Sequence, residues 1–118
     1  MLKLRQKTIH ADGVTITVRE RIGADVWTRP FIEARLRLVD NELQQFLARQ
    51  FVDYLIQTVS IEGLDFEWPT LESSDEELLA AFDAWQHIPP DLMTQWANIL
   101  FEINTNGIVP ESDTGPES

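Results

Sequence analysis

The most regular hydrophobic pattern in the chain lies in residues 30–59. Apolar side chains recur there at steps of three and four, and this spacing places them along one face of an α-helix. The segment is therefore predicted to be helical and to bury this face in the core. The residues of the stripe are Ile32, Leu36, Val39, Leu43, Phe46, Leu47, Phe51, Tyr54, Leu55 and Val59.

The apolar stripe is interrupted at one position, because helical spacing places the charged Asp40 on the apolar face of the helix. A carboxylate buried there without a partner would be costly. We therefore predict two helices, over about residues 29–39 and 42–58, with Asp40 or Asn41 capping the second. Thr28 is the expected cap of the first helix.

Residues 2–20 are predicted to form a β-hairpin around the dipeptide Asp12-Gly13, which favours a two-residue type I′ turn. Residues 14–18 alternate strictly between apolar and polar side chains. Pairing across this turn sets Ile9 opposite Ile16 and keeps the apolar side chains on one face. A lone hairpin is marginally stable in water, so this face must pack on another element. We expect that support to be the helix from residue 30 onward.

The middle of the chain carries a turn and an extended segment. Residues 60–63 are expected to end the second helix in a turn at Gly63. Residues 64–69 then alternate large apolar with acidic side chains, which predicts either a short strand or an extended crossover laid on the core.

Two further helices are predicted near the C-terminus. Ser74-Asp75-Glu76-Glu77 has the residues of a capping box, with acids where the helix dipole favours them, and predicts a helix over 75–86. Pro89 and Pro90 force a corner, after which a second helix is predicted over 90–105. Residues 110–118 consist mainly of Pro, Gly, Ser and acids and are predicted to be a disordered acidic tail.

These elements predict an α+β protein that is mainly helical. Its N-terminal β-hairpin is expected to pack on a small bundle of about four helices, within a single domain over residues 1–109. A length of 118 residues, with 43% apolar side chains, is enough for one such core.

Charge divides the chain into two unlike halves. Residues 1–49 hold all nine Lys and Arg and six acids, for a net charge of +3, whereas residues 50–118 hold fourteen acids and no Lys or Arg. Such an acidic half repels nucleic acid and anionic membranes and attracts a basic partner. The alternative reading is that the acidity only keeps a small protein in solution.

The residue types of catalytic and metal sites are sparse. Cysteine is absent, the two histidines His10 and His87 stand apart in the sequence, and the glycines are isolated. The acids of residues 62–77 lack the spacing of a calcium loop. We therefore expect no enzyme activity, no metal site and no cofactor. The chain has no apolar leader at its start, and its longest unbroken apolar run is residues 78–82, which is too short to span a membrane. We therefore expect a cytoplasmic location and no membrane span.

Aromatic side chains are the remaining candidates for a site, because aromatic residues anchor many protein interfaces. We expect one of Trp27 or Trp68 to be partly exposed. The candidate partner-binding residues are Trp27, Phe66, Trp68, Trp85 and Trp96.

The order of motifs over residues 14–104 resembles the small tail assembly chaperones of long-tailed bacteriophages and prophages. That family commonly begins with a strand of the form V-x-V-R-E and has an acidic, glycine-containing turn before a helix of the form D/E-E-x-L-x-x-L. Pro30, Pro89 and Pro90 depart from the family pattern. The segments that carry the resemblance are Val14-Thr15-Ile16-Thr17-Val18-Arg19-Glu20, Gly23-Ala24-Asp25, Val59-Ser60-Ile61-Glu62-Gly63, Phe66-Glu67-Trp68-Pro69 and Ser74-Asp75-Glu76-Glu77.

The resemblance implies a non-enzymatic role in the cytoplasm of a bacterial host. Tail assembly chaperones bind the long helical tape-measure protein while the tail tube polymerises around it. The implied partner is thus the tape-measure protein or another tail protein, and self-association is a further expectation. The alternative, drawn from the charge of residues 50–118, is an acidic inhibitor or nucleic-acid mimic that binds a basic protein.

Overall fold

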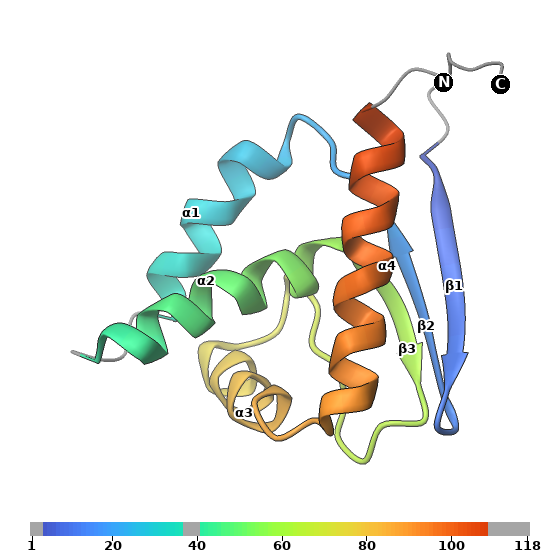
Figure 1. The fold of residues 1–118 in the computed structure, drawn as a ribbon. Helices are drawn as coiled ribbons and strands as arrows, with labels where there is room; N and C mark the ends of the chain where they lie inside the picture. Colours follow the sequence, from blue (N-terminus) through green and yellow to red (C-terminus); the bar gives the residue numbers. More distant parts are fainter. Residues whose placement is uncertain (1–3, 37–40, 109–118) are drawn as a thin grey trace, which may run out of the picture.

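The computed structural model describes residues 4–36 and 41–108. The predicted α+β, mainly helical fold class is confirmed, with the strands on one side of the molecule and most of the helices on the other (Figure 1). Residues 2–3 of the predicted hairpin and the predicted tail of residues 110–118 lie outside the described residues. In chain order the elements are β1 (Gln6–Ala11), β2 (Val14–Arg19), α1 (Asp25–Arg35), α2 (Glu42–Gln57), β3 (Thr58–Glu62), α3 (Asp75–Trp85) and α4 (Pro90–Ile108).

The three strands form one antiparallel sheet in the order β1-β2-β3. The predicted hairpin register is confirmed, because Ile9 pairs with Ile16. Both turn residues have positive φ, 53° at Asp12 and 79° at Gly13. A type I′ turn requires this at its two central positions, which explains why the dipeptide predicts the turn correctly.

The third strand, β3, takes the place of residues 60–62 of the predicted turn, so that part of the prediction is wrong. Gly63, with a φ of 100°, bends the chain directly after the strand, as predicted. α2 passes into β3 without a loop, and Ile61 pairs with Ile16 on the central strand. The run from Thr58 to Ile61 is rich in β-branched side chains, which fit a pleated surface better than a helix end. Inside the core, Trp96 Nε1 donates to Thr58 Oγ1 at 3.1 Å and anchors the start of the strand.

Helix α1 begins at Asp25, four residues before the predicted start, so Thr28 is not its cap. The Thr28 hydroxyl lies within the helix and donates to the Ala24 carbonyl at 3.2 Å. Pro30 lies in the second turn of the helix, where it leaves the Val26 carbonyl without its helical N–H donor.

The predicted break between the first two helices is confirmed. α1 ends at Arg35 and α2 begins at Glu42, with Asn41 as the cap whose side chain accepts from the Gln44 N–H at 3.0 Å. Asp40, the other candidate cap, lies outside the described residues. The capping box of α3 is also confirmed, since Ser74 and Glu77 each accept from the backbone N–H of the other.

The helix that covers the sheet is α4, and the prediction that the helix from residue 30 supports the hairpin is wrong. α4 lies across β1 and β2, whereas α1 packs on α2 (Figure 1). Val14, Ile16 and Val18 are buried on the covered face. At one end of this face, Lys7 of β1 pairs with Glu102 of α4 at 3.1 Å.

Aromatic rings fill the core between α2, α3, α4 and the segment before α3. Phe51 lies 5.4 Å from the ring centres of both Phe82 and Trp85 and 5.6 Å from that of Trp68. Trp96 stacks obliquely on Trp68 at 4.9 Å. Residues 64–69 form no strand. They bend at Asp65 and Phe66 and cross the core with Leu64, Phe66 and Trp68 packed against it, as the crossover alternative predicts.

The hydrophobic stripe of residues 30–59 divides into buried and exposed members. Ile32, Leu36, Phe51 and Leu55 are buried as predicted. Val39 lies outside the described residues. The prediction is wrong for Leu43, Phe46 and Val59, whose side chains are exposed.

Candidate protein-binding surfaces

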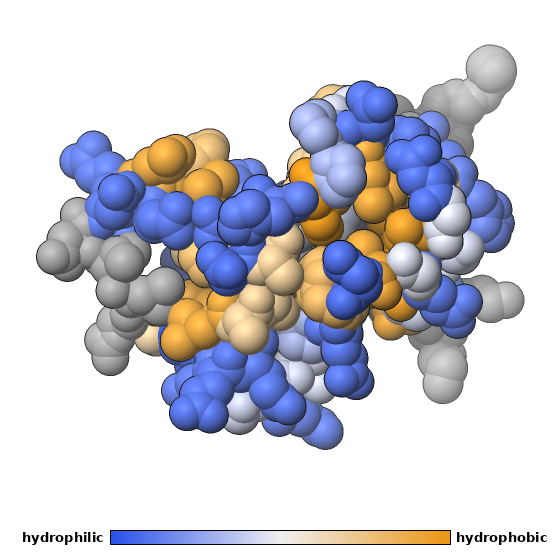
Figure 2. Space-filling view, turned by 90° about the horizontal axis from the view of Figure 1, so that it is seen from below, coloured by the Kyte–Doolittle hydropathy of each residue, from blue (hydrophilic) through white to orange (hydrophobic). Residues whose placement is uncertain are grey.

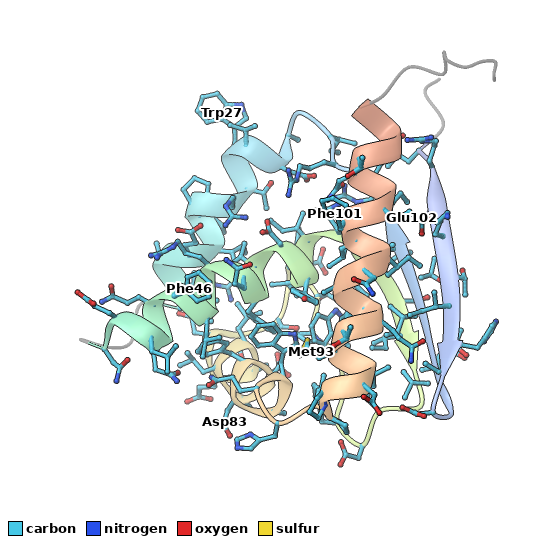
Figure 3. The ribbon with its side chains drawn as sticks, in the orientation of Figure 1. Trp27, Phe46, Asp83, Met93, Phe101 and Glu102 are labelled. Atoms are coloured by element: carbon cyan, nitrogen blue, oxygen red, sulfur yellow. The ribbon has the colours of Figure 1, made fainter. Side chains whose placement is uncertain are left out.

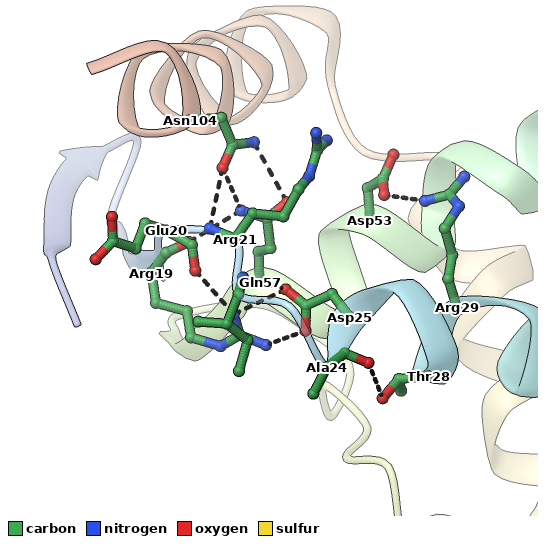
Figure 4. A network of polar contacts seen from close by, with 11 residues as sticks. Arg19, Glu20, Arg21, Ala24, Asp25, Thr28, Arg29, Asp53, Gln57 and Asn104 are labelled. Carbon is green, nitrogen blue, oxygen red and sulfur yellow. Dashed lines mark hydrogen bonds and ion pairs between the residues drawn. The ribbon is translucent and has the colours of Figure 1, made fainter. Parts of the chain in front are cut away.

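Helix α1 is fastened to the rest of the molecule by its charged side chains. At its first turn Arg19 donates to Asp25 through both terminal nitrogens, at 3.1 and 3.0 Å (Figure 4). Asp25 also accepts from the Ile22 N–H at 2.9 Å. A bidentate guanidinium–carboxylate pair of this kind fixes direction as well as distance. It ties the start of α1 to the end of β2.

The remaining charges of α1 are also paired with neighbours. Arg29 donates to Asp53 of α2 and pairs with Glu33 one turn along at 3.2 Å. Near the helix end, Arg35 donates to Asp75 and to two backbone carbonyls of the segment before α3. In two of these contacts, a basic residue of the first half of the chain pairs with an acid of the second half. As a result, every charged side chain of α1 is paired, either with a residue of another segment or with a second charged side chain of α1.

The solvent side of α1 is consequently apolar. We define the outer face of α1 as Trp27, Pro30, Phe31 and Ala34, all of which are exposed. At about 100° per residue these four positions lie within about 100° of the helix circumference. Trp27 and Phe31 expose 79% and 65% of their surface. Figure 3 shows Trp27 projecting away from the body of the molecule.

A second candidate surface is a groove between α1 and α4. Two neighbouring hollows share Arg21, Asp53 and Gln57, so they form one depression, with α2 as its floor. We call this the α1–α4 groove. Phe101, 73% exposed, stands on its α4 side and is turned toward α1 (Figure 3). The exposed side chain of Val26 stands on its α1 side.

The end of the groove is held by a network of amide groups (Figure 4). The buried Gln57 side chain donates to the Arg19 carbonyl at 3.0 Å and to Asn104 Oδ1 at 2.7 Å. Asn104 also accepts from the Arg21 N–H at 3.2 Å. Because these bonds join β2, α2 and α4, they fix the α4 wall of the groove relative to its floor.

Tyr54 on the groove floor has a perturbed acidity. Burial, and secondarily the negative charge of Asp53, raises the pKa of the Tyr54 phenol above its ordinary value near 10. The ring packs edge-on against Trp85 and Trp96, with centroids at 5.2 and 5.0 Å. The phenol is therefore protonated at neutral pH, and its ring acts there as a packing group.

The predicted partner-binding residues occupy three different environments. Trp27 is exposed, which confirms that one of Trp27 or Trp68 reaches the surface. Phe66 and Trp68 are half-buried and line two shallow hollows beside β3 and α3. Trp85 and Trp96 belong to the core, so a partner could touch them only if the core opened.

Sequence reasoning missed Phe31 and Phe101, the other exposed aromatics of the two surfaces. Neither lies three or four positions from a buried residue, so helical spacing sets both off the buried faces of their helices. The signal available in the sequence was that one face of the helix, formed by Trp27, Pro30, Phe31 and Ala34, contains no charged residue.

Exposed acids of the second half of the chain gather in the segment before α3 and in the first turn of that helix. Seen from below, hydrophilic side chains enclose several hydrophobic patches (Figure 2). Among the described residues, no group of His, Cys, Asp and Glu has the arrangement of a metal site, and no helix is long and apolar enough to span a membrane. The acids of residues 62–77 are all exposed, namely Glu62, Asp65, Glu67, Glu72, Asp75, Glu76 and Glu77.

Comparison with known proteins finds no matching family model, no matching curated protein and no matching solved structure.

Proposed function

We propose that this protein is a non-enzymatic binding protein that holds a helical segment of a partner in the α1–α4 groove. From the motif order of residues 14–104, we further propose a tail assembly chaperone whose partner is the tape-measure protein, acting in the bacterial cytoplasm. The observation that carries the binding role is the groove, which has helices for both walls and its floor and exposed apolar side chains on both walls.

The groove offers the chemistry of a helix-binding site. Amphipathic helices commonly dock by laying apolar residues, spaced three and four apart, into a groove between helices. Val26 and Phe101 would meet such residues from opposite walls. Gln50 and Thr105, which also line the hollows, offer hydrogen bonds to polar groups at the edge of the partner helix.

The charge of the molecule limits what the partner can be. Within the groove Asp53 is paired with Arg29, so the acids that attract a partner lie outside it. A helix with an apolar stripe would fit the groove, and basic flanking residues on that helix would fit the acids outside the groove. Nucleic acid fits neither, because a chain with a net charge of −11 repels its phosphates.

Co-expression with the tape-measure protein encoded beside it tests this proposal. We expect the two proteins to co-purify, and we expect Phe101→Glu to reduce the amount of captured tape-measure protein at least tenfold. Leu43→Glu, which also replaces an exposed apolar residue but lies outside the groove, should leave capture unchanged. Neighbouring genes unrelated to phage tails would contradict the chaperone proposal, and equal capture by both variants would contradict the groove.

A second candidate function, an acidic inhibitor or nucleic-acid mimic, is favoured by the exposed acids of residues 62–77. Only Asp75 among them has an ion pair with a basic side chain in the described structure, so the others are available to a basic partner. Binding through these carboxylates would weaken steeply between low and high salt. Binding in the apolar groove, to which basic flanking residues of the partner only add, would weaken much less with salt, so a salt series distinguishes the two functions.

A further inference from the structure

We propose that the outer face of α1 is a self-association surface, on which α1 of a second copy of this chain docks in antiparallel orientation about a two-fold axis. This surface is separate from the α1–α4 groove of the proposed function. The inference rests on the direction in which α1 points its side chains, on the symmetry of its exposed positions and on the distribution of charge.

In helix α1 the distribution of charged and apolar side chains is the reverse of that in an ordinary surface helix. Surface helices ordinarily turn charged side chains to water and apolar ones to the core. Here Asp25, Arg29, Glu33 and Arg35 are all at least half-buried and ion-paired, and only part of the apolar set, chiefly Ile32, faces the core. Two large aromatic rings are thereby left on one side of a short helix, which is typical of an interaction site.

The exposed positions match a two-fold partner. Positions 27, 30, 31 and 34 are symmetric about the midpoint between Pro30 and Phe31. In antiparallel pairing about this midpoint, Trp27 therefore lies opposite Ala34 of the second copy, and Pro30 opposite Phe31. Each large ring then meets a smaller side chain, which is the complementarity that an isologous interface requires.

Charge favours a second copy over a basic partner at this face. The chain has a net charge of −11, so two copies repel unless they meet where no acid is exposed. The outer face of α1 contains no charged side chain, and the exposed acids of the described residues lie elsewhere, most of them in residues 62–77. A basic partner would find nothing on this face to pair with, whereas an identical neutral face is well matched.

The size of the face predicts a weak dimer. Aromatic side chains bury about 150–250 Å² each, so two partly exposed rings with their small neighbours supply on the order of 400 Å² per copy. Stable dimers generally bury more than about 1,200 Å² in total. We therefore expect self-association that depends strongly on concentration, with dimers forming at high micromolar concentration.

Sedimentation equilibrium of the full chain over a range of concentrations tests the proposal. The wild type should show a reversible monomer–dimer equilibrium, and Trp27→Glu should be monomeric throughout. Phe101→Glu is the matched control, because it also places a carboxylate on a highly exposed aromatic position but on α4. It should dimerise like the wild type. Thermal unfolding of each variant verifies that it is folded.

The register is tested by exchanging the large and small positions. Trp27→Ala and Ala34→Trp should each weaken the dimer at least tenfold, whereas the double variant restores a large ring opposite a small one and should regain dimerisation. A wild type that stays monomeric at all concentrations overturns the proposal. A dimer that survives Trp27→Glu, or that is lost in Phe101→Glu, overturns it as well, because the contact would then lie elsewhere.

Discussion

Arg19 and Asp25 form a bidentate ion pair that joins the last residue of β2 to the first residue of α1. Both side chains are largely removed from water, with 16% and 11% of their surface exposed. The pair fixes the rotation of α1 about its axis at the point where the helix begins. That rotation turns the charged side chains toward the molecule and leaves Trp27 and Phe31 in water.

We predict that Asp25→Asn lowers the free energy of unfolding by about 2–3 kcal/mol, because it leaves a largely buried guanidinium without its counter-charge. Glu33→Gln removes a more exposed partner of Arg29 on the same helix and should cost only about 0.5 kcal/mol. Urea unfolding of the two variants measures the difference. Equal effects would contradict the role assigned to the Arg19–Asp25 pair.

The close approach of two turns gives a second prediction. A Cβ added at Gly63 would lie 2.3 Å from the Gly13 carbonyl oxygen, and Gly63 also has a φ of 100°. We expect Gly63→Ala to destabilise the fold by about 3 kcal/mol or more, through backbone strain and the clash together. Gly13→Ala isolates the strain, because its φ is 79° but nothing lies within 4 Å of the added Cβ. It should cost about 1 kcal/mol.

Phe51 is the centre of the aromatic cluster and is fully buried. Phe51→Ala should lower the free energy of unfolding by about 3–5 kcal/mol, because it removes the ring and leaves a cavity. Phe51→Leu keeps most of the volume and should cost markedly less. Chemical denaturation gives both values, and similar costs for Ala and Leu would contradict the central place of this ring.

Tyr54 gives a prediction about pH. It is the only tyrosine of the chain, so the ultraviolet absorbance of tyrosinate reports its ionisation directly. The midpoint should lie above 10, because burial and, to a smaller extent, the negative charge of Asp53 both disfavour the charged phenolate. Asp53→Asn should therefore lower the pKa of Tyr54 only part of the way back.

The raised pKa of Tyr54 also fixes the sign of a stability change. Above about pH 10 the unfolded chain loses the tyrosine proton before the folded protein does. The free energy of unfolding is then unaffected by this group below pH 10 and falls as pH rises through the folded pKa. Tyr54→Phe should remove that fall, and an unchanged pH dependence in this variant would show that another group causes it.

Local signals in the sequence predict much of this fold. The turn at Asp12 and Gly13, the cap at Asn41 and the capping box at Ser74 each depend on residues within a few positions, so the sequence specifies them directly. Which helix covers the sheet depends instead on contacts between distant segments. No local pattern shows that α4 rather than α1 lies on Ile16.

The candidate surfaces could be predicted only in part, for a reason that α1 makes clear. Helical spacing places Ile32 on one face and Phe31 on another, but hydrophobicity alone assigns both to a core. The direction in which α1 faces is decided by its charged side chains. Asp25 pairs with Arg19 of β2. Arg29 donates to Asp53 of α2, and Arg35 donates to Asp75 of α3. Those pairings are visible only in the folded structure.

The central claim is that the groove beside α1 binds a partner helix. Capture of the co-expressed tape-measure protein by Phe101→Glu and Trp27→Glu, compared at equal amounts with the wild type, tests it most directly. We predict that Phe101→Glu loses the partner, while Trp27→Glu, altered only on the outer face of α1, retains it. Full capture by Phe101→Glu, or loss of capture in Trp27→Glu alone, would contradict the account.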